Sequence, residues 1–170
     1  MNGTFDKIIY INEKLKLIGV FIGGLAAVFM MLIIVADVFM RNIFTSPISG
    51  TYEIVQYFLM PLAIFPALAY TYSSGVLPRL GELVEKAPNG FKKVSTWIII
   101  IIEITIFTLL TIYGWKFAMA GVGDQMAIAV GGKLTPVYPV YFLIPIGFGL
   151  IVIEVLLSAI KPLIKNKSTT

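Results

Sequence analysis

One carboxylate, Glu103, lies inside a long apolar stretch of this sequence and is the first residue to consider for chemistry. A carboxylate buried in a membrane segment can bind a proton or a substrate, or can instead join two helices as a neutral or paired group. The polar residues near it on the same stretch are three threonines, Thr105, Thr108 and Thr111. No cation lies at a similar depth in the other apolar stretches, so the structural role is favoured for Glu103.

Cysteine and histidine are both absent from the 170 residues. Disulfides, thiolate nucleophiles, Cys/His zinc sites and imidazole acid–base chemistry are therefore excluded. The nine Asp and Glu residues show no clustered spacing typical of a hard-cation site. We expect no catalytic residue, no metal site and no cofactor. A membrane enzyme would need a polar cluster near the lipid surface, and the sequence shows none.

Three further charged residues, Asp37, Arg41 and Glu53, flank a short connection between two apolar stretches. Asp37 precedes Arg41 by four positions, which is the favourable order for an ion pair along a helix. We expect the three side chains to meet in one acid–base cluster that pins a helical hairpin. Docking of an outside partner is the alternative role.

The composition indicates that membrane-spanning helices must position these residues. Hydrophobic residues make up 58% of the chain and charged residues 13%, whereas a soluble domain carries about a quarter charged residues. The first uncharged run, Leu17 to Ala36, has 20 residues, or about 30 Å of helix, enough to cross a bilayer. It is too long for the apolar region of a signal peptide, and no small-residue cleavage site follows it.

We therefore predict an all-α integral membrane protein in which residues 1–170 form a single membrane domain. Its four transmembrane helices are expected at 17–40, 53–77, 94–115 and 134–160. The remaining segments are an interfacial N-terminal segment (1–16), a cytoplasmic connection (78–93), a periplasmic connection (116–133) and a cytoplasmic tail (161–170).

The distribution of Lys and Arg predicts the orientation. The N-terminal segment, the second connection and the tail, which lie on one side of a four-span protein, together hold ten basic residues. The opposite side holds only Arg41, Lys116 and Lys133. By the positive-inside rule, both termini are expected in the cytoplasm.

Amphipathic segments and aromatic residues are expected at the membrane surfaces. Residues 5–16 place their apolar side chains close to one helical face, and residues 78–88 read as a short amphipathic helix bracketed by prolines. Trp97 and Trp115 stand 18 positions apart, about 27 Å along a helix, and suit the two interfaces as anchors.

Small residues at intervals of four predict close helix packing. Gly19 and Gly23 form a GxxxG pattern in the first span, and Ala63 and Ala67 repeat the spacing in the second. The pattern is common in membrane helices and indicates only that these faces pack against something.

Four prolines interrupt the second and fourth spans: Pro61, Pro66, Pro139 and Pro145. Each removes a backbone donor and bends its helix. Broken helices can build a substrate site, but no unwound Gly/Ser/Asn stretch accompanies these prolines, so static kinks are favoured.

Three stretches together resemble the small, four-helix, Q-type (DctQ-like) membrane subunit of the TRAP (tripartite ATP-independent periplasmic) transporters. They are the exit of the first span with the entry to the second (37–53), Gly123-Asp124-Gln125, and the proline-punctuated 135–147. The resemblance covers nearly the whole chain. One departure is Ser74-Gly75-Val76-Leu77, where the family often shows a Gly-x-His stretch.

The resemblance implies a bacterial inner-membrane subunit that does not itself hold the substrate. It would scaffold a large multi-helix subunit that moves an organic acid, such as a dicarboxylate or sialic acid, together with sodium by an elevator motion. A periplasmic binding protein would deliver the substrate through transient contacts. The partners implied are thus these two proteins and lipid, and not nucleic acid. Arg41, Glu53 and Asp124 match outer-face positions of the family and become candidate contacts.

Two other functions remain open at this point. One is a self-sufficient, homodimeric, proton-coupled transporter that uses Glu103 as its coupling carboxylate. The other is a membrane enzyme. Transport by the purified chain alone would favour the first, whereas co-purification of a large hydrophobic partner would favour the scaffold.

Overall fold

The computed structural model describes residues 2–74 and 89–165. Four helical segments in these ranges are long and apolar enough to cross a membrane: Ile9–Phe44, Thr51–Ser73, Val94–Gly123 and Tyr138–Ala159. The prediction of a mostly helical chain with four helices able to span a membrane is thereby confirmed. The short amphipathic helix expected at 78–88 lies outside the described residues.

The first span belongs to one continuous helix, α1 (Asn2–Phe44). Its 43 residues correspond to about 65 Å, twice the thickness of a bilayer core. No proline interrupts the sequence before Pro47, so nothing forces a break. Residues 2–16 therefore belong to the same continuous helix as the first span, and the interfacial position expected for residues 1–16 stays a prediction.

The second span changes its helical geometry around its prolines. It consists of α2 (Thr51–Ile54), a π-helical turn (Val55–Leu59), α3 (Met60–Ile64), a 3₁₀ turn (Phe65–Ala67) and α4 (Leu68–Ser73). Pro61 and Pro66 have no backbone N–H to donate, so the ladder of i→i−4 hydrogen bonds cannot run unbroken through this segment. The prolines of this span are thus accompanied by local π and 3₁₀ geometry, and the expected static kinks stay a prediction.

The third span lies in α6 (Asn89–Gly123), which extends eight residues beyond the expected end at residue 115. Its end is closed by two hydrogen bonds, from Met126 N to Gly121 O (2.9 Å) and from Gln125 N to Val122 O (3.2 Å). Gln125 has a φ of 46°, so these bonds form a Schellman motif with a non-glycine residue in the left-handed position.

A β-hairpin follows, at the end of the segment expected as a periplasmic connection (116–133) and the start of the expected fourth span. Strand β1 (Ala127–Val130) pairs antiparallel with β2 (Lys133–Pro136), and Val130 lies opposite Lys133. Gly131 and Gly132 form the two-residue turn with φ values of 55° and 85°, as a tight hairpin requires. The all-α prediction is wrong for these residues.

The fourth span is divided into α7 (Tyr138–Tyr141) and α8 (Leu143–Lys165). Pro139 lies in the first turn of α7, where a missing N–H costs little. Pro145 lies near the start of α8. The expected start of this span at residue 134 is too early, since β2 occupies residues 133–136.

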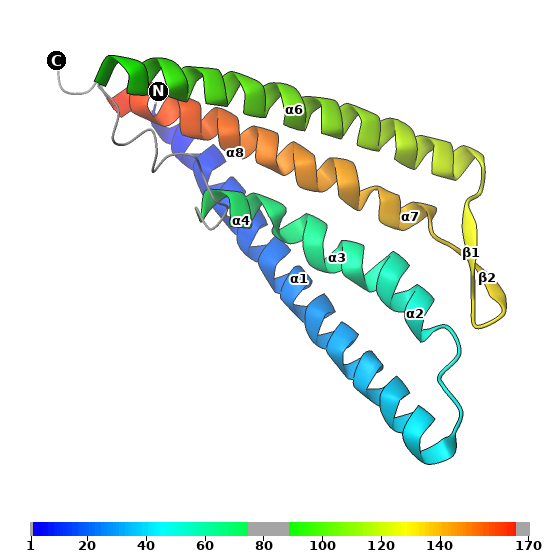
Figure 1. Cartoon of the computed structure of the whole chain (residues 1–170). Coiled ribbons are helices and arrows are strands. Elements are labelled where there is room, and N and C mark those ends of the chain that lie inside the picture. The colour runs from blue at the N-terminus through cyan, green and yellow to red at the C-terminus, as the bar shows by residue number, and fades with distance from the viewer. Residues whose placement is uncertain (1, 75–88, 166–170) are drawn as a thin grey trace.

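The helices lie side by side in the order α1, second span, α8 and α6 (Figure 1). The start of α1 and the end of α8 lie at the same end of the molecule, which we call the termini end (Figure 1). The opposite end carries β1 and β2 and is called the hairpin end. Towards the hairpin end, α1 diverges from α6 and α8 (Figure 1).

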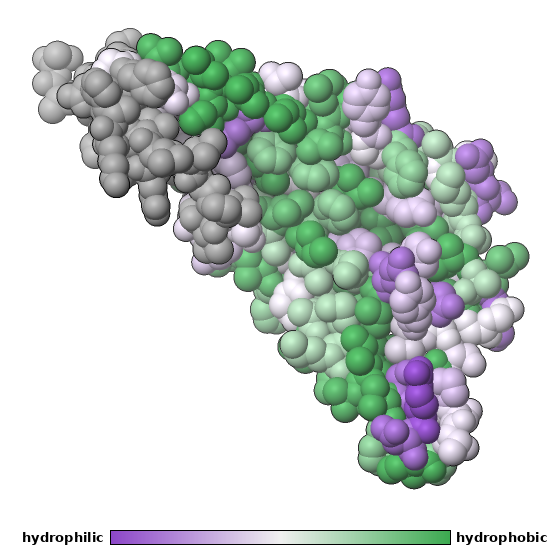
Figure 2. Space-filling model, in the orientation of Figure 1, coloured by the Kyte–Doolittle hydropathy of each residue, from purple (hydrophilic) through white to green (hydrophobic). Residues whose placement is uncertain are grey.

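The buried core is small and lies where α4, α6 and α8 meet. Ala69, Tyr72, Ile151 and Val155 form it, with partly buried neighbours such as Phe107 packed around them. Most large apolar side chains of α1 and α6 are exposed instead. Figure 2 shows apolar side chains over most of one face of the molecule, with hydrophilic ones gathered towards the hairpin end. Such a surface is suited to lipid or to another membrane protein.

Candidate functional site

Asp37 organises the first connection at the hairpin end. Its Oδ2 accepts a hydrogen bond from Arg41 Nη2 (2.9 Å), and its Oδ1 accepts one from the backbone N–H of Ile48 (2.7 Å). The hydroxyl of Thr51 donates to the carbonyl of Ile48 (3.0 Å) and also lies 3.5 Å from Asp37 Oδ1. Asp37 is buried, so its carboxylate fixes the loop onto the last turns of α1.

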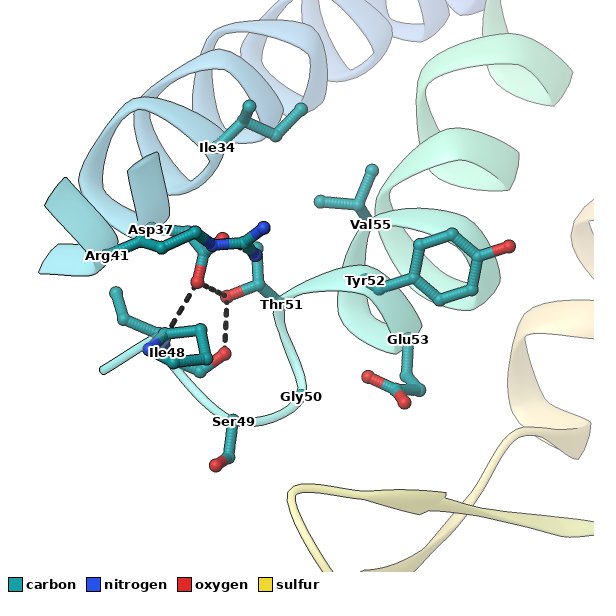
Figure 3. Close-up of a pocket in the computed structure, with 11 residues that line it drawn as sticks. Ile34, Asp37, Arg41, Ile48, Ser49, Gly50, Thr51, Tyr52, Glu53 and Val55 are labelled. Carbon is teal, nitrogen blue, oxygen red and sulfur yellow. Dashed lines mark hydrogen bonds and ion pairs between the residues drawn. The ribbon is translucent and has the colours of Figure 1, made fainter. Parts of the chain in front are cut away.

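A hollow of about 420 Å³ opens beside this carboxylate, between the end of α1 and the start of the second span (Figure 3). Apolar side chains such as Ile34 and Val55 line one part of it, and Arg41, Tyr52 and Glu53 line another. Glu53 points away from Arg41 (Figure 3). Among the described residues no ion pair involves Glu53, so the structure forms only the Asp37–Arg41 part of the expected three-membered cluster.

The two connections at the hairpin end touch each other. Gly50 has a φ of 91°, and a Cβ added there would lie 2.8 Å from Val130 Cγ1 and 2.9 Å from Gly131 N. A Cβ on Gly131 would in turn lie 3.1 Å from the carbonyl oxygen of Ser49. The tip of the hairpin is therefore packed backbone to backbone against the first connection.

Asp124 lies at the hairpin end of α6, directly before the Schellman residue Gln125. Its backbone N–H donates to the carbonyl of Ala120 (2.9 Å), and its side chain is exposed. Within residues 2–74 and 89–165, no group of three Asp, Glu, His or Cys side chains is arranged to hold a metal ion.

Glu103 is engaged in a contact between two helices. The hydroxyl of Tyr72, at the end of α4, donates a hydrogen bond to Glu103 Oε2 on α6 at 2.5 Å. Tyr72 is buried, and its ring packs edge-on against Phe107, with ring centroids 6.1 Å apart. This geometry suits a structural role for Glu103.

A second interhelical polar cluster, which was not predicted from the sequence, lies towards the termini end. Glu154 Oε2 on α8 accepts a hydrogen bond from Asn12 Nδ2 (2.6 Å) and lies 3.1 Å from Lys16 Nζ, both on α1. Lys16 Nζ also lies 2.8 Å from Glu13 Oε1. Lys16 is only 2% exposed, so its charge is buried and compensated by carboxylates.

One signal for this cluster was present in the sequence. Glu154 interrupts an otherwise apolar run in the last span, and a carboxylate in such a position needs a partner. Its partners are 138 and 142 positions away in the chain, at Lys16 and Asn12, and periodicity cannot identify them.

The small residues of α1 lie directly against the second span. A Cβ on Gly19 would collide with the carbonyl of Pro66. A Cβ on Gly23 would lie 2.6 Å from the carbonyl oxygen of Ala63 and 3.3 Å from Ala67 Cβ. The structure thus brings together the two small-residue faces.

The two tryptophans lie on α6 and are both exposed, Trp97 towards the termini end and Trp115 towards the hairpin end. The ring of Trp115 packs edge-on against Phe142, with centroids 5.6 Å apart. Their role as membrane-interface anchors stays a prediction.

Comparison with known proteins identifies a family. The family model of the DctQ component of the tripartite ATP-independent periplasmic transporters matches residues 30–164, which is most of the chain. No curated protein and no solved structure matches the chain.

Proposed function

Because the chain belongs to the DctQ family of tripartite ATP-independent periplasmic transporter components, we propose that it scaffolds a large, multi-helix transport subunit. In this role it is the small, non-catalytic membrane subunit of a sodium-driven secondary transporter. The large subunit binds sodium and an organic acid, either a dicarboxylate or a sugar acid such as sialic acid. A periplasmic binding protein delivers the acid.

The observation that carries this proposal is that two carboxylates within the helices, Glu103 and Glu154, contact other helices of this chain. Glu103 accepts a hydrogen bond from Tyr72, and Glu154 is bound to Lys16 and Asn12. Each contact joins two helices of this same chain. A coupling residue in a transporter must exchange its partners as substrate moves, whereas these groups hold helices together, as a fixed scaffold requires.

The surroundings of the bundle fit the same role. Exposed apolar side chains cover much of α1 and α6, which leaves a wide area for lipid and for a large membrane partner. At the hairpin end, Arg41, Glu53 and Asp124 are our candidates for contacts with partner proteins. We place this end in the periplasm and both termini in the cytoplasm, on the strength of the ten-to-three count of basic residues.

Reconstitution into liposomes tests the proposal. The chain alone, the large subunit alone and the two together are compared, each with the binding protein outside and an inward sodium gradient. We expect uptake of the organic acid only when both membrane subunits are present. Uptake by this chain alone would overturn the scaffold role, and a sodium gradient of the opposite sign is the control for coupling.

The self-sufficient transporter that uses Glu103 is not favoured. Its coupling carboxylate would have to leave Tyr72, whose ring is packed in the core, in every cycle.

A further inference from the structure

The hollow at the hairpin end lies at the boundary between apolar and polar parts of the chain. Asp37 closes the uncharged run that begins at Leu17, and Ile34, one turn earlier, faces the hollow. Val55, at the start of the second span, lines it as well. In a helix that crosses a bilayer, this boundary lies at the depth where hydrocarbon gives way to lipid headgroups.

Arg41 and Glu53 both line this hollow and are not paired with each other (Figure 3). Arg41 uses Nη2 to bind Asp37, but a guanidinium has five N–H donors and the Arg41 side chain is 65% exposed. Glu53 has no ion pair with any described residue. The Asp37 carboxylate, by contrast, already accepts hydrogen bonds from Arg41 and from the backbone N–H of Ile48.

The charges therefore complement a ligand that carries both an anion and a cation above an apolar tail. We propose that the hollow binds a phospholipid with a primary-amine headgroup, of the phosphatidylethanolamine type. Arg41 donates to the phosphate, because its planar fork matches phosphate oxygens. Glu53 accepts from the ammonium group, and the start of an acyl chain lies along Ile34 and Val55.

This assignment predicts a ranking of lipids. Phosphatidylcholine keeps the positive charge but has no N–H donors for Glu53. Phosphatidylglycerol has no cation at all, and its net negative charge meets the Glu53 carboxylate. Lipid binding at this site requires only that the chain is inserted in a membrane. It can therefore be tested independently of the scaffold role proposed above.

Native mass spectrometry of the full-length, delipidated chain tests the site by titration with each of the three lipids. For the unaltered chain we expect phosphatidylethanolamine to bind about two- to fivefold more tightly than phosphatidylglycerol, the range of an exposed ion pair. Glu53→Gln should remove this preference. Arg41→Gln should weaken all three lipids about tenfold, and Arg41→Lys, which keeps the charge beside Asp37, should weaken them less.

Two variants at the same end but outside the hollow serve as matched controls, Asp124→Asn and Lys133→Gln. Both side chains are exposed, and both changes remove one charge, so neither should alter the ranking. Equal binding of phosphatidylethanolamine and phosphatidylglycerol by the unaltered chain would overturn the proposal. The proposal would also be overturned if Asp124→Asn changed the lipid preference as much as Glu53→Gln, or if Lys133→Gln weakened lipid binding as much as Arg41→Gln. The effects would then follow from net charge alone.

Discussion

The side chains of Asn12 and Glu154 share a buried hydrogen bond of 2.6 Å, although 142 positions separate them in the sequence. Lys16, one turn after Asn12, reaches the same carboxylate oxygen at 3.1 Å. These contacts join α1 to α8 towards the termini end, while the contact between Tyr72 and Glu103 joins α4 to α6. Each of the four spans thus takes part in one of two separate polar contacts, α1 with α8 and the second span with α6.

Loss of the Glu154 carboxylate should destabilise the fold. Glu154→Ala leaves the buried Lys16 with only Glu13, and we expect a loss of about 3 kcal/mol in the free energy of unfolding. Unfolding in detergent–SDS mixtures, followed by tryptophan fluorescence, measures it. The control is Glu13→Gln, whose side chain is 51% exposed and should cost less than about 1 kcal/mol.

A double variant tests whether the pair itself is responsible. Lys16→Met with Glu154→Leu removes both charges and leaves none buried alone. Its destabilisation should be smaller than the sum of the two single effects. Strict additivity would show that Lys16 and Glu154 do not depend on each other.

The glycines of α1 offer a comparison within a single helix. Gly23→Ala places a Cβ 2.6 Å from the Ala63 carbonyl oxygen, and Gly19→Ala collides with Pro66, so each should cost about 1–3 kcal/mol. Gly24→Ala meets nothing within 4 Å and should be neutral, or stabilising by up to about 1 kcal/mol through helix propensity. The same unfolding assay checks all three. Equal effects at Gly23 and Gly24 would contradict the packing of α1 on the second span.

Glu103→Gln should leave transport by the assembled system intact. The amide oxygen can still accept the hydrogen bond from Tyr72, so the helices stay joined. Tyr72→Phe removes that bond and should lower the stability by about 1 kcal/mol. Sodium-driven uptake in liposomes is the measurement. Loss of uptake in a Glu103→Gln transporter that assembles normally would argue for a coupling role of this carboxylate.

Gly50→Ala should separate the two connections at the hairpin end. The substitution combines a φ of 91° with a Cβ 2.8 Å from Val130, and the backbone strain alone is worth about 1–2 kcal/mol. We expect faster trypsin cleavage after the exposed Lys133 in the loosened hairpin. The control is Gly123→Ala, whose Cβ meets nothing within 4 Å and should leave the cleavage rate unchanged.

The proposed orientation can be measured directly because the chain contains no cysteine. Lys133→Cys should react with a membrane-impermeant maleimide in spheroplasts. Lys14→Cys, on the exposed part of α1, should react only after permeabilisation. The reverse pattern would place the hairpin end in the cytoplasm.

The number and type of the spans could be predicted from the sequence because uncharged runs of 20 residues have few alternatives in so short a chain. Their ends were predicted less well. α1 and α6 both continue beyond their apolar runs, since polar residues outside the membrane can also be helical. The Gly131-Gly132 turn between Val130 and Lys133 was a usable hairpin signal in the sequence, although it lies outside the long apolar runs that predict the spans.

The polar contacts between helices were beyond prediction for a physical reason. In an apolar helix, the faces that meet lipid and the faces that meet protein have similar composition, so periodicity does not show which side packs. The small size of Gly19 and Gly23 indicated close packing of their face of the helix, but not its partner. Glu154 was visible only as an interruption of an apolar run, and its partners lie at the other end of the chain.

The Glu154 contacts also set an order of events during synthesis. Asn12 and Lys16 belong to the first span to leave the ribosome, whereas Glu154 belongs to the last. Until α8 is made, the charge of Lys16 has only the carboxylate of Glu13, within its own helix, as a partner. A chain truncated before α8 would therefore leave Lys16 without its Glu154 partner.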